Sequence, residues 1–267
     1  MKAAALIPRA LFALYLAAFF VYLFAPLAIM GAATFNDSRF PTVTPWRGTT
    51  LKWFDALWAD RAMWRSLGTS LIVAAGVVAV ALPAGTAAAL VLTSLNARAR
   101  GFMYALMVSP LLTPGVVIGI ATLVLWRQLG VGGGVVLIVL AQASFVIAYV
   151  MLMVAARLQR FDRAQEEAAL GLGASKFMVF RRVLLPFLRP ALIAAGFIAF
   201  LQSVENYNTT LFVRGLDTPL TVYIATKVRT GLTPAVNALG LILIVATVLG
   251  AVAFEIARRR QARKGAV

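Results

Sequence analysis

Six long runs of apolar residues, separated by shorter polar connections, dominate this chain. They cover residues 10–33, 66–94, 102–126, 133–156, 191–213 and 236–257. A helix of about 20 apolar residues crosses the hydrocarbon core of a bilayer, which is about 30 Å thick. The third run contains Pro110 and Pro114, which membrane helices tolerate where neighbours satisfy the freed carbonyls, and the fifth becomes polar from Gln202 onward. The pattern predicts an all-α, polytopic membrane protein with about six transmembrane helices in a single domain, residues 1–267.

Composition supports this prediction and removes several classes of chemistry. Hydrophobic residues make up 62% of the 267 positions and charged residues 13%, which is more apolar than a soluble domain can bury. The absence of Cys and His excludes Cys-based zinc sites, thiolate nucleophiles, disulfides and imidazole acid–base catalysis. The sequence has no G-x-x-x-x-G-K-[ST] segment, so the chain cannot cradle ATP phosphates by itself. It also lacks G-x-S-x-G and H-E-x-x-H segments, which argues against an intramembrane hydrolase.

The distribution of Lys and Arg predicts the orientation of the chain. With the N-terminus in the cytoplasm, the cytoplasmic segments hold 16 of the 25 basic residues and the opposite side holds nine. Because cytoplasmic loops are enriched in Lys and Arg, and an even number of spans returns the chain to the same side, both termini are expected in the cytoplasm. The net charge of +16 then reflects orientation and contact with anionic lipids of the bilayer. We expect no nucleic-acid partner, because the charges are dispersed among membrane loops rather than gathered on one face.

Residues 1–33 have a second interpretation, as a cleaved signal peptide, because Lys2 and Arg9 precede an apolar core and GAA follows it. The apolar stretch is longer than the core of a usual signal peptide. We favour a retained first helix, since its removal would place the two basic ends of the chain on opposite sides of the membrane.

The first external loop, residues 34–65, contains the segment LKWFDALWADRAMWR. In a helix, Trp53, Leu57 and Trp64 would share one face, with the charged side chains outside it. The segment is therefore predicted to be an amphipathic helix in the membrane interface, where indole rings favour the headgroup level. Such a helix either anchors the loop in the membrane or docks an external partner.

The largest cytoplasmic loop, residues 157–190, is dense in charge. A first helix is predicted from Arg163 to Leu172, because Asp162 can cap it and two glutamates lie in its first turn, where the helix dipole favours acids. Gly171 and Gly173 interrupt this helix, since Gly costs about 1 kcal/mol relative to Ala inside a helix.

A second helix follows in the same loop. Ser175 can cap it, Phe177, Phe180 and Leu184 share one of its faces, and Pro186 and Pro190 are expected to end it. A short helix–turn–helix with a small-residue, apolar surface suits insertion into a groove of another protein. The alternative is a helical loop that lies on the bilayer surface.

Seven residues of this loop follow a fixed spacing. They are Glu167, Ala168, Ala169, Gly173, Val183, Leu185 and Pro186. The spacing resembles the EAA loop of permease subunits in binding-protein-dependent ABC importers, whose pattern is EAA, three residues, G, nine residues, I, one residue, LP. Val183 in place of Ile is the sole departure.

The resemblance covers nearly the whole chain and implies the type I ABC importer permease fold, in the bacterial inner membrane. In that family the loop forms a coupling helix, which sits in a cleft of the cytoplasmic ATPase dimer and converts ATP-driven closure into rocking of the spans. The resemblance thus implies that ATP and Mg²⁺ are bound by that partner and that this chain binds no cofactor. The other implied partners are an extracytoplasmic solute-binding protein and a second permease subunit, in a heterodimer or a homodimer.

Two further segments narrow the resemblance. FNDSRF followed by GTTLKWFDALW, and GLTPAVNALGLILIV near the C-terminus, are similar to the spermidine/putrescine permeases. This implies a small organic cation, such as a polyamine, as substrate. An amino-acid derivative or an anion is the first alternative, and a membrane assembly protein without transport or an intramembrane enzyme are further ones.

Polar groups at membrane depth are costly and commonly face a cavity or a partner. The fifth run ends in such a group, QSVENYNTT, and the third contains SPLLTPG. The candidate translocation-path residues are Gln202, Glu205, Asn206, Tyr207, Asn208, Thr209 and Thr113. If the fifth run stays helical, Gln202, Glu205 and Thr209 share a face.

An ionised Glu205 at membrane depth needs compensation. A cationic substrate could pair with it while Asn206, Tyr207 and Asn208 supply hydrogen bonds or a cation–π face. Alternatively, Glu205 pairs with Arg214 or with a base of a partner subunit, or it reaches external water. The pair Glu205–Asn206 departs from the paired acids that a polyamine permease would be expected to carry.

The remaining polar and small residues of the spans are expected to hold helices together. Gln142, Ser144 and Tyr149 in the fourth run suit hydrogen bonds between helices better than ligand contact. Gly115 and Gly119 have the G-x-x-x-G spacing that lets spans pack closely.

Overall fold

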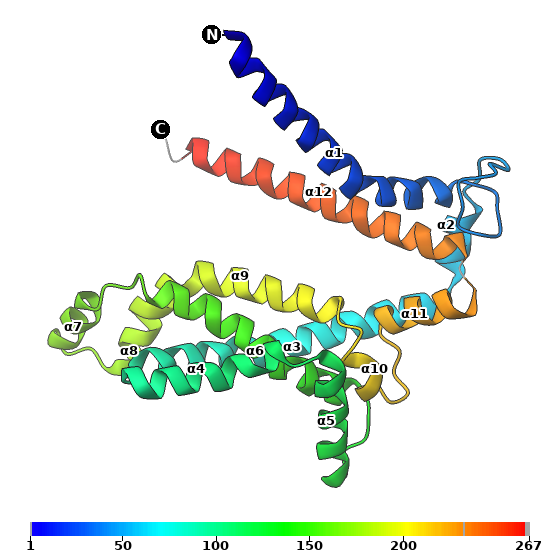
Figure 1. The fold of residues 1–267 in the computed structure, drawn as a ribbon. Helices are drawn as coiled ribbons and strands as arrows, with labels where there is room; N and C mark the ends of the chain where they lie inside the picture. The colour runs from blue at the N-terminus through cyan, green and yellow to red at the C-terminus, as the bar shows by residue number, and fades with distance from the viewer. Residues whose placement is uncertain (1, 232, 265–267) are drawn as a thin grey trace. The chain divides into compact units, whose positions relative to one another are not determined.

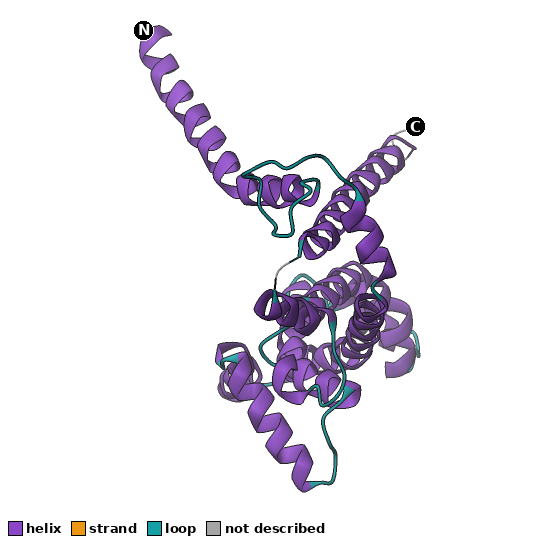
Figure 2. Cartoon of the chain, turned by 90° about the vertical axis from the view of Figure 1, so that its right-hand side faces the viewer, coloured by secondary structure: helices purple, strands orange, loops and turns teal. Residues whose placement is uncertain are grey.

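The computed structural model describes residues 2–231 and 233–264. Within these residues the chain is built from helices, and an isolated β-bridge joins Asn36 and Thr49 (Figures 1 and 2). The helices form two compact units. Unit 1 contains the chain up to Arg61 and from Ile224 onward, and unit 2 contains residues 62–223.

Unit 2 holds most of the helices. They are α3 (Arg61–Ser94), α4 (Ala97–Leu112), α5 (Gly115–Gln128), α6 (Val135–Leu158), α7 (Ala164–Gly171), α8 (Lys176–Val179), a π-helix (Phe180–Leu184), α9 (Leu185–Val204), α10 (Thr210–Val213) and the start of α11 (Leu220–Thr230). Unit 1 holds α1 (Lys2–Thr34), α2 (Lys52–Ala59) and α12 (Pro234–Lys264).

Every predicted apolar run is helical over most of its length. Four helical stretches in the described residues are long and apolar enough to cross a membrane: Leu11–Thr34, Arg61–Ser94, Val135–Leu158 and Lys176–Val204. The helices α4 and α5 together form a fifth, bent candidate, and the described apolar part of α12, Pro234–Gly250, is shorter. These six segments follow the six predicted runs in order, but the fifth is displaced: its helix is Lys176–Val204, whereas the predicted run is 191–213.

The third predicted run does not form one helix. It is broken between α4 and α5, which meet at a bend of 102°. Pro110 lies inside α4, whereas Thr113 adopts an extended conformation (φ −87°, ψ 130°). A residue that precedes proline is pushed out of the helical region by the proline ring, so Pro114 explains why the helix stops at this point.

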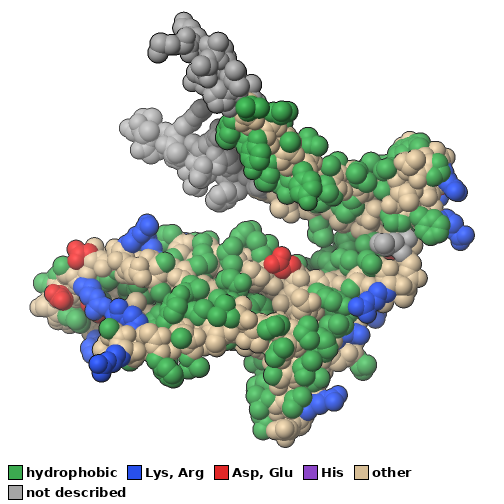
Figure 3. Space-filling view, viewed as in Figure 1, with side chains coloured by type: hydrophobic (Ala, Val, Ile, Leu, Met, Phe, Trp, Pro, Cys, Tyr) green, Lys and Arg blue, Asp and Glu red, His purple; other side chains and the backbone are tan. Residues whose placement is uncertain are grey.

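The helix α6 forms the centre of unit 2. Half of its apolar window is buried, against 28% for α3 and 17% for the helix Lys176–Val204. Its buried side chains, including Ile138 and Val146, belong to one core with Val77 of α3 and Leu188 of α9. The surrounding helices turn apolar side chains outward, and Figure 3 shows these across the visible face. Such a surface is suited to lipid.

In unit 1, Asn36 organises the loop after α1. Its buried side chain donates through Nδ2 to the carbonyls of Thr42 (2.8 Å) and Pro45 (3.1 Å), and its Oδ1 accepts from the Arg47 N–H (2.8 Å). Its backbone carbonyl accepts from the indole N–H of Trp53 on α2 at 3.0 Å. This amide therefore fixes a backbone that is otherwise irregular, and it links the FNDSRF segment to the LKWFDALW segment.

The prediction of one amphipathic helix through Trp53, Leu57 and Trp64 is wrong. The helix α2 ends at Ala59, Asp60 adopts an extended conformation, and Trp64 lies in α3. Leu57 is buried, and Trp53 is half-buried and bonded to Asn36. Trp53 and Leu57 are thus used for packing inside unit 1, because Asn36 offers the indole N–H of Trp53 a protein partner, whereas Trp64 belongs to unit 2 and is 39% exposed.

Replacing Asn36 with Ala should destabilise the protein. The change removes three hydrogen bonds by which the buried Asn36 holds exposed loop residues, and each such bond contributes about 0.5–1.5 kcal/mol. Thermal unfolding of the purified protein in detergent, followed by tryptophan fluorescence, measures the loss. The control is Thr42→Ala, which leaves the Thr42 carbonyl in place. Equal unfolding temperatures of the two variants would contradict this role of Asn36.

Candidate functional site

We call residues 157–190 the EAA-like loop. Its first predicted helix is present as α7. The Asp162 Oδ1 accepts from the N–H of Ala164 at 3.0 Å at the start of α7. Glu166 and Glu167 lie in the first turn and are exposed. The acidic end of this helix is therefore directed to solvent, next to the positive end of the helix dipole.

The turn between α7 and α8 also follows the prediction. Gly173 has φ +84°, a left-handed conformation that favours glycine, and it directly follows the last turn of α7. The Ser175 Oγ accepts from the N–H of Met178 at 3.2 Å and caps α8. The glycine of the EAA-like spacing is thus the residue that reverses the chain.

The prediction that Pro186 and Pro190 end the second helix is wrong. The helix α8 passes into the π-helix Phe180–Leu184 and continues through both prolines as α9. In a regular α-helix, Pro186 would remove one hydrogen bond and its ring would clash with the Arg182 carbonyl, four residues earlier. The π-turn contains Arg182 and widens the helix there, which relieves this conflict. The second helix of the loop and α9 therefore form one continuous helical element, Lys176–Val204.

The π-turn also changes which side chains share a face. Phe177 is 71% exposed, whereas Phe180 and Leu184 are half-buried, so the predicted common face of these three residues is wrong. An α-helical spacing no longer holds across a turn with i→i+5 bonds.

The exposed surface of the EAA-like loop combines charge with apolar side chains. Leu172 is 90% exposed, and Phe177 lies on the same loop. The residues of the EAA-like spacing are also accessible: Glu167, Ala168, Gly173, Leu185 and Pro186 are exposed, and Ala169 and Val183 are half-buried. In Figure 1 the helices α7 and α8 lie at one end of unit 2, with α7 beyond the ends of α4 and α6. This surface is available to a partner.

The polar stretch at the other end of α9 is not a helix throughout. The helix α9 ends at Val204, and residues 205–209 form turns before α10 begins. The expectation that Gln202, Glu205 and Thr209 share one helical face is therefore wrong: Gln202 is half-buried, Glu205 is exposed and Thr209 is fully buried. We call residues 205–209 the polar break.

The Glu205 carboxylate lies at the start of the polar break. Among the described residues it has no ion-pair partner. Arg214, the neighbour considered from the sequence, donates instead through Nη1 to the Asp217 carbonyl at 3.1 Å and to the Thr218 hydroxyl at 3.3 Å. The carboxylate is thus free for a cation that comes from outside this part of the chain.

A buried hydrogen-bond network supports the polar break. Gln142 of α6 is 1% exposed; its Nε2 donates to the Thr210 Oγ1 at 2.8 Å, and its Oε1 accepts from the Ser203 Oγ at 2.5 Å. The Asn206 Oδ1 accepts from the Thr210 N–H at 3.3 Å and from the Thr210 Oγ1 at 3.2 Å. Gln142 therefore joins helices, as predicted, and the carboxamide oxygen of Asn206 is already used within the chain.

The sequence did not indicate roles for Ser203 and Thr210. Both belong to the stretch QSVENYNTT, but their partner Gln142 lies on a different helix. Ser144, which we grouped with Gln142, donates instead to the carbonyl of Ala141 in its own helix at 2.7 Å.

The break between α4 and α5 lies beside the polar break. A Cβ at Gly115 would be 2.9 Å from the Thr209 Oγ1 and 3.3 Å from the Asn208 Cβ, and a Cβ at Gly119 would be 2.7 Å from the Thr209 carbonyl oxygen. Both glycines thus permit the close packing that their spacing predicted. Thr113, two residues before Gly115, donates to the Ser109 carbonyl at 3.0 Å.

The chemistry available at the two breaks is recognition rather than catalysis. An exposed carboxylate, the exposed Asn208 and the half-buried Tyr207 can bind a polar cation. The buried Thr209 hydroxyl has no hydrogen-bond partner among the described residues. Within the same residues, no group of three or more His, Cys, Asp or Glu side chains could hold a metal ion.

Comparison with known proteins identifies the family to which this chain belongs. Residues 81–264, which include the EAA-like loop and the polar break, match the family described as binding-protein-dependent transport system inner membrane component. The chain belongs to this family. It is a multi-pass inner-membrane permease of an ABC importer, so ATP hydrolysis belongs to a separate subunit.

Two relatives from Escherichia coli (strain K12) are similar to nearly the whole permease. The putrescine transport system permease protein PotI is 33% identical over 255 residues, which cover 92% of this chain and 90% of PotI. The spermidine/putrescine transport system permease protein PotC is 30% identical over 248 residues, which cover 92% of each protein.

Solved structures confirm the fold. A chain of a bacterial ABC transporter involved in the import of the acidic polysaccharide alginate has a TM-score of 0.70 at 16% identity, over 95% of the permease and 96% of that chain. A chain of an amino acid ABC transporter has a TM-score of 0.57 at 20% identity, over 79% of the permease and all of that chain (100%). The predicted all-α, type I importer permease fold is therefore correct.

Adding one methyl group at Gly119 should loosen the packing of the two breaks in this permease. The new Cβ in Gly119→Ala would meet backbone of the polar break, and overpacking of this kind costs about 1–3 kcal/mol. The matched control is Gly68→Ala in α3, where a Cβ has nothing within 4 Å. Thermal unfolding in detergent should show a lower midpoint for Gly119→Ala only. A midpoint as high as that of Gly68→Ala would contradict the close approach.

Proposed function

We propose that this permease forms half of the pore of a polyamine importer and is driven by an ATPase dimer that binds the EAA-like loop. The observation that carries the coupling is the exposed apolar surface of that loop. Leu172 and Phe177 are largely exposed on a segment that is otherwise charged. An apolar helical surface of this kind suits insertion into a groove of a partner protein.

The continuous helix Lys176–Val204 gives this coupling a path. It has the EAA-like loop at one end and the polar break at the other. At 1.5 Å per residue it extends over about 40 Å, which exceeds the hydrocarbon thickness of a bilayer. ATP and Mg²⁺ bind to the ATPase, closure of the ATPase dimer moves the loop, and the helix carries that motion to the polar break.

The remaining partners follow from the same proposal. A soluble binding protein delivers the solute from outside the membrane, and a second, related permease subunit completes the pore as a heterodimer. The EAA-like loop and both chain termini lie in the cytoplasm, which accords with the excess of basic residues in these segments.

A small organic cation is the proposed substrate, with Glu205 as its counter-ion in the polar break. The support is the exposed carboxylate, which lacks an ion-pair partner among the described residues, and the similarity to permeases named for putrescine and spermidine. Tyr207 and Asn208 add a cation–π face and an amide beside the carboxylate. Only one acid stands at this point, which favours contact with one amine of the substrate at a time.

An Ala168→Glu substitution should uncouple ATP hydrolysis from uptake. Ala168 is exposed on α7, so the spans should fold normally, whereas a charge in the surface that enters the ATPase should weaken docking. ATPase activity and uptake of labelled putrescine are measured together in proteoliposomes with the partner subunits.

The matched control for this change is Ala56→Glu, at an exposed position of α2. It should keep both activities. Normal uptake by Ala168→Glu would refute the coupling role and favour a loop that lies on the bilayer surface.

Substituting Glu205 by Gln should reduce polyamine uptake by roughly tenfold or more, because a hydrogen bond to a charged group contributes about 1.5–3 kcal/mol. Initial rates of labelled putrescine and spermidine uptake measure the effect. Asp55→Asn, at an exposed acid of α2, serves as the control.

Two results would count against this substrate assignment. Uptake unchanged by Glu205→Gln removes Glu205 from recognition. Transport of an amino-acid derivative or an anion, with no polyamine uptake by the unmodified importer, refutes the polyamine proposal while leaving the permease family intact.

A further inference from the structure

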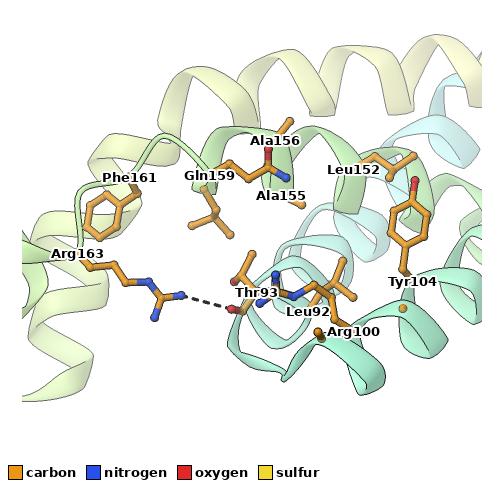
Figure 4. A pocket seen from close by; sticks show the side chains of 13 residues that line it. Leu92, Thr93, Arg100, Tyr104, Leu152, Ala155, Ala156, Gln159, Phe161 and Arg163 are labelled. Atoms are coloured by element: carbon orange, nitrogen blue, oxygen red, sulfur yellow. Dashed lines mark hydrogen bonds between the residues drawn. The ribbon is translucent and has the colours of Figure 1, made fainter.

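A second site lies in unit 2, at the end that carries the EAA-like loop and away from the polar break. A cavity of about 810 Å³ opens between the last turn of α3, the first two turns of α4 and the last turns of α6. Figure 4 shows Arg100 and Tyr104 of α4, Leu152 of α6, and Phe161 and Arg163 of the following segment around this space.

The polar side of this cavity carries two arginines without counter-ions. Arg163 donates through Nη2 to the Thr93 carbonyl at 3.3 Å, and Arg100 donates through Nη2 to the Leu95 carbonyl at 3.0 Å. In the described part of the chain, neither guanidinium has a carboxylate within 4.0 Å. A guanidinium has five N–H donors, so most donors of both side chains remain available. Their planar, forked geometry matches phosphate.

Much of the remaining lining of the cavity is apolar. Leu92, Leu152 and Phe161 line it, and Leu92 is buried in the core of unit 2. Tyr104 lies one turn beyond Arg100 on α4, and Figure 4 shows it beside Leu152. Arginine and tyrosine close to aliphatic side chains are a combination suited to the boundary between headgroups and hydrocarbon in a membrane.

We propose that this cavity binds an anionic phospholipid of the inner leaflet. The two arginines hold the phosphate, and the apolar wall contacts the start of the acyl chains. Basic pockets between membrane helices on the cytoplasmic side have the chemistry for such headgroups. The location in the inner leaflet rests on the orientation in the proposed function, whereas the binding itself does not.

The site has a direct connection to coupling. Arg163 immediately precedes α7, and its bond to Thr93 ties the base of that helix to α3. A phosphate bound by both Arg163 and Arg100 would also connect the base of α7 to α4. Bound lipid would therefore fix the position from which the EAA-like loop projects.

The test is thermal unfolding of the purified full-length permease in a neutral detergent, titrated with phosphatidylglycerol, phosphatidylcholine or inorganic phosphate. Saturating phosphatidylglycerol should raise the unfolding midpoint by roughly 5 °C or more, and the other two additions should not. The double variant Arg100→Gln/Arg163→Gln should lose the shift. The control Arg98→Gln/Arg160→Gln removes two exposed arginines from the same segments, outside the cavity lining, and should keep it.

A second variant tests the site with both arginines in place. Ala156 is exposed and lines the cavity, so Ala156→Glu adds a carboxylate that competes with phosphate and should also abolish the shift. An equal shift with phosphatidylcholine, or loss of the shift in the control double variant, would show a general lipid effect and overturn the proposal. An equal shift with inorganic phosphate would assign the cavity to a soluble anion.

The remaining outcome concerns the ATPase. Retention of the lipid shift by both cavity variants, with loss of ATPase co-purification, would show that the cavity belongs to the ATPase interface, and it would also overturn the proposal. Because binding is measured on the permease alone, its failure is distinguishable from failure of the importer assignment, which uptake measures.

Discussion

A lipid hydrocarbon core offers no hydrogen bonds, so a membrane helix can stop within it only where the protein satisfies the freed polar groups. Two apolar segments of unit 2 are broken, one at Thr113 and the other after Val204, and the two breaks lie side by side. Gly115 gives room for Asn208 and Thr209, while Gln142 supplies hydrogen bonds from α6 to the residues that flank the polar break. The irregular backbone at the two breaks is thus held by contacts with α5 and α6, and its arrangement leaves a carboxylate exposed.

The need to satisfy backbone hydrogen bonds also bears on the junction between the EAA-like loop and α9. Pro186 would ordinarily separate a loop helix from a membrane helix, because it removes a hydrogen bond and crowds the preceding turn. The π-turn at Phe180–Leu184 allows the helix to continue, so a force on the second helix of the EAA-like loop acts directly on α9. A permease whose energy source is another subunit needs such a connection, since the chain itself carries no phosphate-binding loop.

Sequence reasoning succeeded where the determining contacts are local. The apolar runs located the spans, because a stretch of about 20 apolar residues has few other uses, and the caps at Asp162 and Ser175 act within three residues. It failed where the contacts are distant: Gln142 and Ser203 are 61 positions apart, and Asn36 contacts a loop whose path no periodicity describes. The error at Pro186 had a different cause. Proline was expected to end an α-helix, but the π-turn before it widens the helix and removes the clash.

The central claim is that the EAA-like loop enters a partner ATPase, and site-specific cross-linking tests it most directly. The chain contains no cysteine, so one introduced cysteine gives a unique reactive position. Leu172→Cys places it on the loop at a residue that is 90% exposed, and Leu216→Cys places it at a residue that is 100% exposed beyond the polar break. Cross-linking in native membranes, followed by mass spectrometry, should yield a P-loop ATPase adduct from Leu172→Cys only. Equal yields from both positions, or no ATPase adduct from either, would contradict the account.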